Sequence, residues 1–318
     1  MCAIGFPQDH TYIAEESSAK EPLTDEPTWV RRWCWRCYPV TTELITTGTR
    51  LQFVDPLDGT TNFVHGYQFC CVSIGFAVAK QLSVGVVYIP MLDELFTAQR
   101  GGGAFLNGEP IRATKGVPLT SAMLVNNVGA GREAPFVDVS MECVRAAFMA
   151  KCHAVRMTGV CVCVCVCVCV CVCVCVCVCV CARARAMARS RRACRTPRSD
   201  RCALAGPGSA AVNMCHSACG RVDAYWELLV GGPWDLAAGA VIVTEAGGSV
   251  TNCDGSTFDI TKLGVLCGCT SVVEGMAPLL TQAIKDTVAK DPVAFAACGD
   301  AMAAAAAAGI TVVAEPSV

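Results

Sequence analysis

Short runs rich in apolar, β-forming residues dominate the chain between positions 69 and 99. They cover 69–78, 83–89 and 94–99 and are joined by turn-like pieces. Segment 101–111 adds glycines and an Asn-Gly pair, which is a strong turn signal. The pattern predicts an antiparallel meander.

Helical periodicity appears in the second half of the chain. Apolar residues at three- and four-residue spacing predict a helix over 132–151. Further helices are predicted over 209–220, which opens with the capping residue Ser209, and over 234–248, with a strand over 222–228 between them. Strands and helices alternate in blocks, which is typical of a layered α/β architecture.

Residues 160–181 break both patterns, with eleven cysteines at alternate positions and valines between them. The run has the length of a membrane span and arginines follow it, but Cys and Val are poor helix formers and a period of two is a strand pattern. Zinc sites group thiolates in close pairs with a loop between the pairs. A repeated TG dinucleotide, in contrast, encodes alternating Cys and Val, and a repeated GC encodes Ala and Arg. We therefore interpret 160–208 as translated simple-repeat DNA.

A second unusual stretch covers 30–52. It begins with Val-Arg and ends with Gln, which match the codons GTGAGG and CAG at the two ends of an intron. Its Cys34 and Cys37 form one Cys-x-x-Cys pair without the second pair that a zinc site needs. We interpret 30–52 as translated intron. A low-complexity tail is predicted over 291–318, which leaves one domain over 1–290 with two interruptions.

The two unusual stretches distort the composition. The chain has 25 Lys+Arg, 27 Asp+Glu and 26 cysteines, but outside 30–52 and 160–208 it has 13 basic side chains, 25 acidic ones and 11 cysteines. An acidic domain favours cations over nucleic acid as partners. No signal peptide is visible, so we expect a cytoplasmic protein without disulfides and without a membrane partner.

The densest chemical pattern is "FVDPLDGTTNF", residues 53–63. Asp55 and Asp58 flank a proline that fixes the backbone, and the following Gly-Thr-Thr-Asn predicts a helix start whose amides face an anion. Two carboxylates in a rigid turn suit a hard divalent cation, and a metal between them and a phosphate is the arrangement of two-metal phosphoryl transfer. An Asx-turn leading into a helix is the purely structural alternative.

Two further acidic positions accompany this motif. Glu15 lies in "YIAEESS" and Asp235 in "GGPWDLAAG", although a solvated pair and a plain helix cap explain each one alone. His65 is interpreted as structural because carboxylates and metal already fill the catalytic roles. Packing explains the other reactive side chains, which lie within the predicted helix (Cys215, His216) or within a predicted strand (Cys70, Cys71).

These motifs resemble the inositol monophosphatase family of metal-dependent, lithium-sensitive sugar phosphatases. The carrying segments are "YIAEES", "DEPTW", "FVDPLDGTTNFVHGYQFCCVSIGFAV", "GAFLNG", "SAAVNMC", "GRVDAYWE" and "GGPWDLAAGAVIVTEAGG". The resemblance implies a layered αβαβα sandwich. It also implies that this chain lacks the family's first helices and carries two insertions, since the family runs directly across the junctions where 30–52 and 160–208 begin and end.

The resemblance assigns roles to individual residues. The implied ligands of two Mg²⁺ ions are Glu15, Asp55, Leu57 through its carbonyl, Asp58 and Asp235. Glu15 and Thr60 are implied to hold the attacking water. The implied contacts of the substrate are Asp58, Gly59, Thr60, Ser209, Ala210, Glu227 and Asp235. A weaker third metal ion and the family's homodimer both depend on helices that we expect this chain to lack.

The implied activity is hydrolysis of inositol 1-phosphate to inositol and phosphate, by in-line attack of a metal-activated water, in inositol metabolism and phosphatidylinositol signalling. An L-galactose 1-phosphate or related sugar-phosphate phosphatase is the first alternative, and an inactive product of mis-splicing is the second. A cysteine-rich metal-binding protein or a single-span membrane protein would require the run in 160–208 to be present in the mature protein.

Overall fold

A computed structural model describes residues 11–14, 50–129, 133–158, 208–292 and 295. The chain divides into two units, 1–159 with 205–318 and 160–204, and every described residue belongs to the first unit. Glu15, the Cys-Val run and most of the stretch 30–52 therefore lie outside the described residues.

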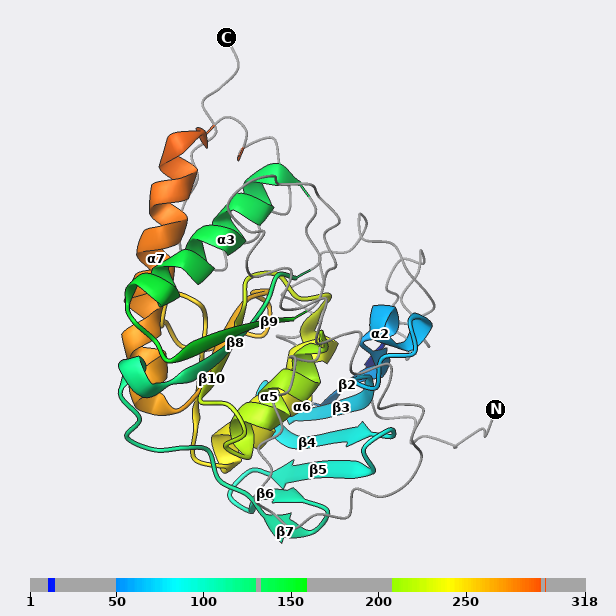
Figure 1. Ribbon diagram of the computed structural model, residues 1–318. Helices are drawn as coiled ribbons and strands as arrows, with labels where there is room; N and C mark the ends of the chain where they lie inside the picture. The colour runs from blue at the N-terminus through cyan, green and yellow to red at the C-terminus, as the bar shows by residue number, and fades with distance from the viewer. Residues whose placement is uncertain (1–10, 15–49, 130–132, 159–207, 293–294, 296–318) are drawn as a thin grey trace. The chain divides into compact units, whose positions relative to one another are not determined.

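The first sheet has seven strands that follow one another in chain order (Figure 1). β1 (Thr11–Ala14) pairs in parallel with β2 (Arg50–Asp58). The antiparallel continuation consists of β3 (Cys71–Val78), β4 (Gln81–Ile89), β5 (Glu94–Gln99), β6 (Gly103–Leu106) and β7 (Glu109–Pro110). The predicted meander is confirmed.

The second sheet has five strands from more distant parts of the chain. Their order is β11 (Ser249–Thr251), β12 (Val265–Gly268), β10 (Ala224–Glu227), β8 (Met123–Asn127) and β9 (Ala154–Thr158). β10 and β9 run parallel to β8, whereas β12 is antiparallel to both of its neighbours. The parallel pairs require crossovers, so helices cover this sheet.

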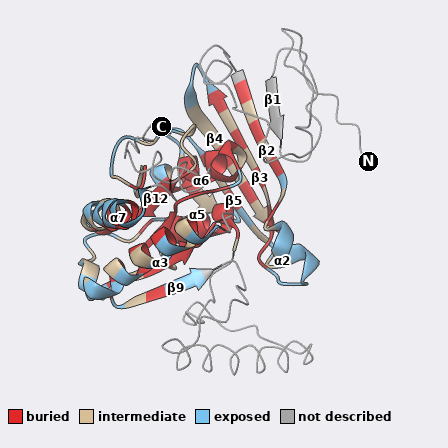
Figure 2. Ribbon diagram, turned by 90° about the horizontal axis from the view of Figure 1, so that it is seen from above, coloured by how far each residue is buried: buried red, intermediate tan, exposed pale blue. Residues whose placement is uncertain are grey.

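Two pairs of helices complete the layers. α5 (Ala210–Ala218) and α6 (Pro233–Glu245) contact strands of both sheets, whereas α3 (Ala134–Met149) and α7 (Thr270–Lys290) pack together against the second sheet. Figure 2 shows α5 and α6 buried and the outer faces of α3 and α7 exposed. The layered α/β prediction is confirmed, with four of the five expected layers in the described residues. The short α2 (Thr60–Val64) and η2 (Leu119–Ser121) join strands to the next elements.

Close packing fixes α6 against the first sheet. Every residue from 236 to 243 is buried, as expected for a helix that is apolar on all sides. Gly75 and Gly85 face this helix from β3 and β4. A Cβ atom at these positions would lie 2.5 Å from the Ala237 Cβ and 2.4 Å from the Ala238 carbonyl oxygen. The two glycines thus allow the second turn of α6 to lie close to the sheet.

The ordered structure extends past two predicted boundaries. Residues 50–52, the end of the interrupting stretch, form the start of β2, and Leu51 is fully buried there. Phe295 lies within the predicted tail but is buried in the core cluster that also contains residues of α3 and α7. In both places the predicted boundary was set where the amino-acid composition changes. The observed boundary depends on burial in the tertiary structure, which composition does not reveal.

Candidate functional site

The buried face of β2 carries apolar side chains first and a carboxylate at its end. Leu51, Phe53 and Asp55 occupy successive buried positions on one face of the strand. The Asp55 Oδ1 then accepts a hydrogen bond from the Leu57 amide at 2.9 Å, and the register of β2 with β3 shifts between Asp55 and Asp58. The Asx-turn alternative is therefore observed, and it gives the turn the fixed shape that a ligand pair needs.

Asp235 comes from the first turn of α6. Its Oδ2 accepts hydrogen bonds from the amides of Gly231 at 2.7 Å and Gly232 at 3.3 Å. Negative charge is stabilised at a helix N-terminus. The Ser73 hydroxyl on β3 donates to the Trp234 carbonyl at 3.1 Å, which ties this turn to the first sheet.

The three aspartates form one buried cluster. One carboxylate oxygen from each of Asp55, Asp58 and Asp235 lies within 4.8 Å of the other two, and the residues are only 1%, 7% and 7% exposed. Burial raises the pKa of the Asp58 carboxyl, since desolvation disfavours its charged form. Buried like charges at this spacing repel one another unless a cation compensates them, and oxygen ligands suit a hard divalent cation. The residues present therefore fit a divalent metal.

The N-terminus of α5 holds Asp58 in place. The Ser209 hydroxyl donates to Asp58 Oδ2 at 2.7 Å, and the Ala211 amide donates to the same oxygen at 2.8 Å. The Cys71 thiol lies 3.8 Å from this oxygen. Ser209 Oγ also accepts from the Val212 amide at 3.1 Å, so the predicted capping residue caps the helix and binds the carboxylate at once.

The turn after Asp58 places Thr60 beside a backbone oxygen. The Thr60 hydroxyl donates to the Leu57 carbonyl at 3.1 Å. α2 starts at Thr60 and has five residues, none of them buried. The Asn62 side chain donates to the Phe69 carbonyl at 2.7 Å and closes the loop that returns the chain to β3. The oxygens of Leu57 and Thr60 consequently lie together in the turn that carries Asp58.

Glu227 ends β10 as a buried carboxyl group. Its Oε2 accepts hydrogen bonds from the Asn127 side-chain amide at 2.9 Å and from the Tyr225 hydroxyl. Burial raises the pKa of Glu227 to about 8, and the charge of Asp58 contributes in the same direction. Glu227 is therefore held at the end of β10 by its own pair of hydrogen bonds.

The predicted site residues that the structure describes thus fall into four groups. Asp55, Asp58 and Asp235 lie together, and Ser209 and Ala210 lie at the N-terminus of α5 facing Asp58. Leu57, Gly59 and Thr60 form the turn into α2, and Glu227 has its own hydrogen-bond network. Glu15 lies outside the described residues. Three groups around the site gave no separate signal in the sequence: the Ala211 amide, Asn127 and Tyr225. A backbone amide has no side-chain pattern, and the two side chains matter only because β8 and β10 pair.

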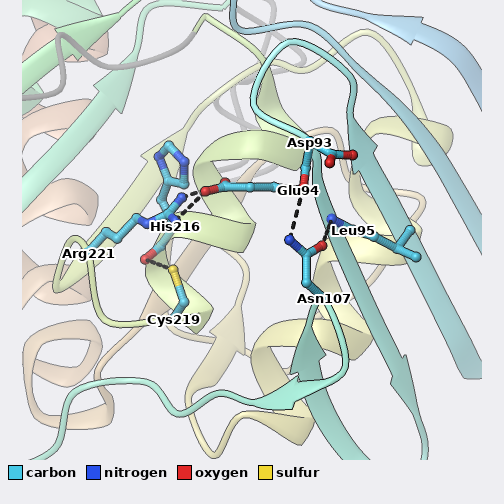
Figure 3. Close-up of polar contacts among 7 residues, drawn as sticks. All are labelled: Asp93, Glu94, Leu95, Asn107, His216, Cys219 and Arg221. Atoms are coloured by element: carbon cyan, nitrogen blue, oxygen red, sulfur yellow. Dashed lines mark hydrogen bonds and ion pairs between the residues drawn. The ribbon is translucent and has the colours of Figure 1, made fainter. Parts of the chain in front are cut away.

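The side chains interpreted as structural are buried or lie away from the cluster. His216 and Cys215 are buried within α5, as expected for packing residues. Cys71 is buried too, but its thiol lies beside Asp58 Oδ2, and His65 is exposed at the end of α2. Figure 3 shows His216 near the ion pair in which Arg221 donates to both carboxylate oxygens of Glu94, at 2.7 and 2.5 Å. This pair connects β5 to the turn after α5.

The membrane and cysteine-rich alternatives rest on residues that the structure does not describe. Within the described residues, no helix combines the length and the apolarity needed to cross a bilayer. The nine cysteines there are free thiols, and eight of them are buried. These cysteines behave as small apolar core residues, as predicted.

Comparison with known proteins gives consistent matches. The profile of the inositol monophosphatase family matches residues 3–205 and 182–288. Inositol monophosphatase 2 and inositol monophosphatase 3 of Solanum lycopersicum are 37% and 38% identical to this chain, over 80% of it and over 70% and 69% of their own lengths. The solved inositol monophosphatase of Anabaena (Nostoc) sp. PCC 7120 is 30% identical with a TM-score of 0.54, covering 74% of this chain and 72% of its own. The suhB extragenic suppressor protein of Bartonella henselae is 25% identical with a TM-score of 0.57, covering 86% and 76%.

Proposed function

The chain belongs to the inositol monophosphatase family, and from this premise we propose that it hydrolyses inositol 1-phosphate to inositol and phosphate with Mg²⁺ as its cofactor. Family members are metal-dependent phosphatases that act on small-molecule phosphate monoesters. The observation that carries the proposal is the buried cluster of Asp55, Asp58 and Asp235. No other group of three or more His, Cys, Asp or Glu side chains in the described part of the chain has this spacing.

We propose that the three aspartates and the Leu57 carbonyl would hold two Mg²⁺ ions. Glu15 is a further proposed ligand. The bound ions would supply positive charge to the phosphate oxygens and lower the pKa of a water molecule. Asp58 is held by Ser209 and Ala211, so its remaining oxygen has a fixed direction for coordination.

The remaining groups position the reactants. Thr60, whose hydroxyl hydrogen is donated to the Leu57 carbonyl, has lone pairs left to accept a hydrogen bond from the attacking water, together with Glu15. The amides of Gly59 and Thr60 are assigned to phosphate oxygens. Positioning and charge stabilisation are the main requirements of phosphoryl transfer, and no covalent phosphoenzyme is needed.

On the alcohol side of the substrate, we assign Ser209, Ala210 and Glu227 to hydroxyl groups. A buried carboxyl group suits a polyol because it forms hydrogen bonds with hydroxyls. A sugar 1-phosphate such as L-galactose 1-phosphate offers the same chemistry and is the second candidate. The plant relatives at 35–38% identity fit either substrate class.

The proposal is tested by phosphate release from inositol 1-phosphate by the full chain. We expect turnover that requires Mg²⁺, stops with EDTA and returns with added Mg²⁺. Asp55→Asn should lower kcat/KM about 100-fold or more, because metal ions contribute several kcal/mol of transition-state stabilisation. His65→Ala, at an exposed position beside the motif, is the control and should stay within about twofold of the parent chain. Metal-independent turnover, or an unchanged Asp55→Asn variant, would contradict the proposal.

A further inference from the structure

Glu227 is anchored through one of its two carboxylate oxygens. β8 and β10 are parallel and in register, so Asn127 is the direct pairing partner of Glu227. Tyr225, two residues before Glu227, lies on the same face of β10. The Asn127 amide and the Tyr225 hydroxyl both donate to Oε2, and all three residues are buried. Two donors from two strands fix the orientation of this side chain.

Gly129 lies beside the other oxygen of Glu227, Oε1. The hydrogen bonds of Asn127 and Tyr225 go to Oε2 and do not use Oε1. A Cβ atom at Gly129 would lie 3.4 Å from Oε1 and 2.5 Å from the Leu229 carbonyl oxygen. The φ angle of +81° at Gly129 also disfavours any other residue. Oε1 is thus the oxygen that neither Asn127 nor Tyr225 occupies.

We infer that Asn127 and Tyr225 are positioning residues that make the enzyme selective for polyol phosphates, because they direct Oε1 of Glu227 toward the hydroxyl groups of the alcohol. The inference rests on the proposed function, in which Glu227 contacts that part of the substrate. A substrate hydroxyl satisfies this buried polar group, whereas a leaving group without additional hydroxyls leaves it unpaired. Sites of this kind discriminate strongly between substrates with and without such hydroxyl groups.

The arrangement explains why an asparagine suits position 127. Its amide donates to Oε2, whereas an aspartate of nearly the same shape would place a second carboxyl group against Glu227. The Tyr225 ring lies in the core, and the hydroxyl is the part of this side chain that contacts Oε2. Asn127→Asp and Tyr225→Phe therefore remove the two hydrogen bonds with little change in volume.

The test compares two substrates in the full chain: inositol 1-phosphate, and 4-nitrophenyl phosphate, whose leaving group has no hydroxyl substituent. For Asn127→Asp and for Tyr225→Phe we expect kcat/KM for inositol 1-phosphate to fall about 10- to 100-fold, the scale of misplacing a reacting group. The value for 4-nitrophenyl phosphate and the Mg²⁺ concentration for half-maximal rate should stay within about twofold. The double variant should fall by less than the product of the single effects, because both residues act on one oxygen.

Tyr88→Phe is the matched control. The Tyr88 hydroxyl also donates to a carboxylate, that of Asp93 at 3.1 Å, but this pair is exposed on β4 and the turn that follows it. Its selectivity should equal that of the parent chain. Tyr225→Phe keeps the buried ring, so the comparison stands even where an Asn127 variant folds poorly.

The outcomes separate this inference from the proposed function. An equal fall for both substrates would indicate a purely structural role and overturn the inference, while the phosphatase activity stands. Unchanged selectivity in both variants would overturn it too. A parent chain with no Mg²⁺-dependent turnover of either substrate would contradict the proposed function, and the inference with it.

Discussion

Asp58 is oriented by residues far from it in the chain. Its Oδ2 accepts from the Ser209 hydroxyl and the Ala211 amide, whereas Asp55 is fixed within its own turn by the Leu57 amide. Hydrogen bonds to a metal-ligating carboxylate fix its orientation in advance, so the side chain loses less conformational freedom when a cation binds. Metal affinity should therefore depend on the α5 N-terminus as well as on the aspartates themselves.

Ser209→Ala tests this dependence. We expect the Mg²⁺ concentration for half-maximal rate to rise about 10- to 100-fold, the range for loss of a partner behind a metal ligand. Ser209→Thr keeps the hydroxyl and should restore most of the affinity. Ser217→Ala is the matched control, because Ser217 is a buried serine on the same helix whose hydroxyl donates to the Asn213 carbonyl, away from the cluster. An equal effect of both alanine variants would contradict the assignment.

His216 is a buried histidine without a hydrogen-bond partner at Nε2. Burial lowers its pKa from 6.5 to about 3, and the nearby Arg221 guanidinium acts in the same direction. Between these two pH values the unfolded chain binds a proton here that the folded chain does not. The folded state should therefore lose stability as the pH falls below 6.5, by up to about 1.4 kcal/mol per pH unit.

Urea unfolding of the parent chain and of His216→Leu measures this contribution. From pH 7.5 to pH 5.0 the parent should lose about 2 kcal/mol more than the variant, since only the parent has this protonation site. At pH 7.5 the folded and the unfolded parent chain are both neutral at this residue, so its protonation adds little to the difference in unfolding free energy between the two chains. A parallel pH dependence of the two chains would show that His216 does not titrate in this way.

The proposed metal ligands were accessible to sequence reasoning and their supports were not. Asp55 and Asp58 stand out because a proline and a glycine surround them, and Asp235 because a Gly-Gly-Pro turn precedes it. Asn127 and Ala211, in contrast, act through the pairing of β8 with β10 and through a backbone amide. Neither relation leaves a local pattern in the chain.

Among the secondary-structure elements, α6 determines whether the ligands meet. It brings Asp235 to the aspartates at the end of β2, and its close approach depends on Gly75 and Gly85. A glycine inside a strand lowers strand propensity, so its presence at both positions is explained by the approach of the helix. Packing here contributes directly to the geometry of the metal site.

Gly85→Ala should disturb both stability and activity. The added methyl group would overlap the Ala238 carbonyl oxygen, and such overpacking costs about 1–3 kcal/mol of unfolding free energy. A shift of α6 also moves Asp235, so the Mg²⁺ requirement should rise. Gly275→Ala is the control: it lies within α7, with its nearest neighbour at an ordinary 3.7 Å, and should be neutral or stabilising by up to about 1 kcal/mol.

The periodic elements were predictable and their arrangement was not. The strands of the meander and the helices α3, α5 and α6 follow from periods of two and of three to four residues. The second sheet collects β8, β9, β10, β11 and β12 across long connections, and its order depends on contacts between distant segments. Arg50, Leu51 and Gln52 were assigned to an interruption, yet they pair with β3. Alternation and burial suit a strand whatever the origin of the residues that form it.

At the scale of the whole molecule, the site residues that the structure describes all belong to one of the two units. Residues 1–159 and 205–318 form this unit, and 160–204 form the other. The boundaries lie close to those of the Cys-Val and Arg-rich stretch at 160–208. We propose that this stretch is not part of the catalytic domain. The spliced transcript should then join the codons of residue 159 directly to those of residue 209.

A chain with 160–208 deleted tests that proposal in the protein. β9 ends at Thr158 and α5 begins at Ala210, both within the first unit, so Ser209 should still reach Asp58. We expect Mg²⁺-dependent turnover of inositol 1-phosphate equal to or above that of the full chain. A Gly/Ser linker of the same length is the matched control, since it keeps the spacing without the cysteines and arginines. The linker should also support turnover, because long surface insertions cost little free energy. If both replacements abolish turnover while the full chain is active, the stretch belongs to the functional fold and the interruption hypothesis is wrong.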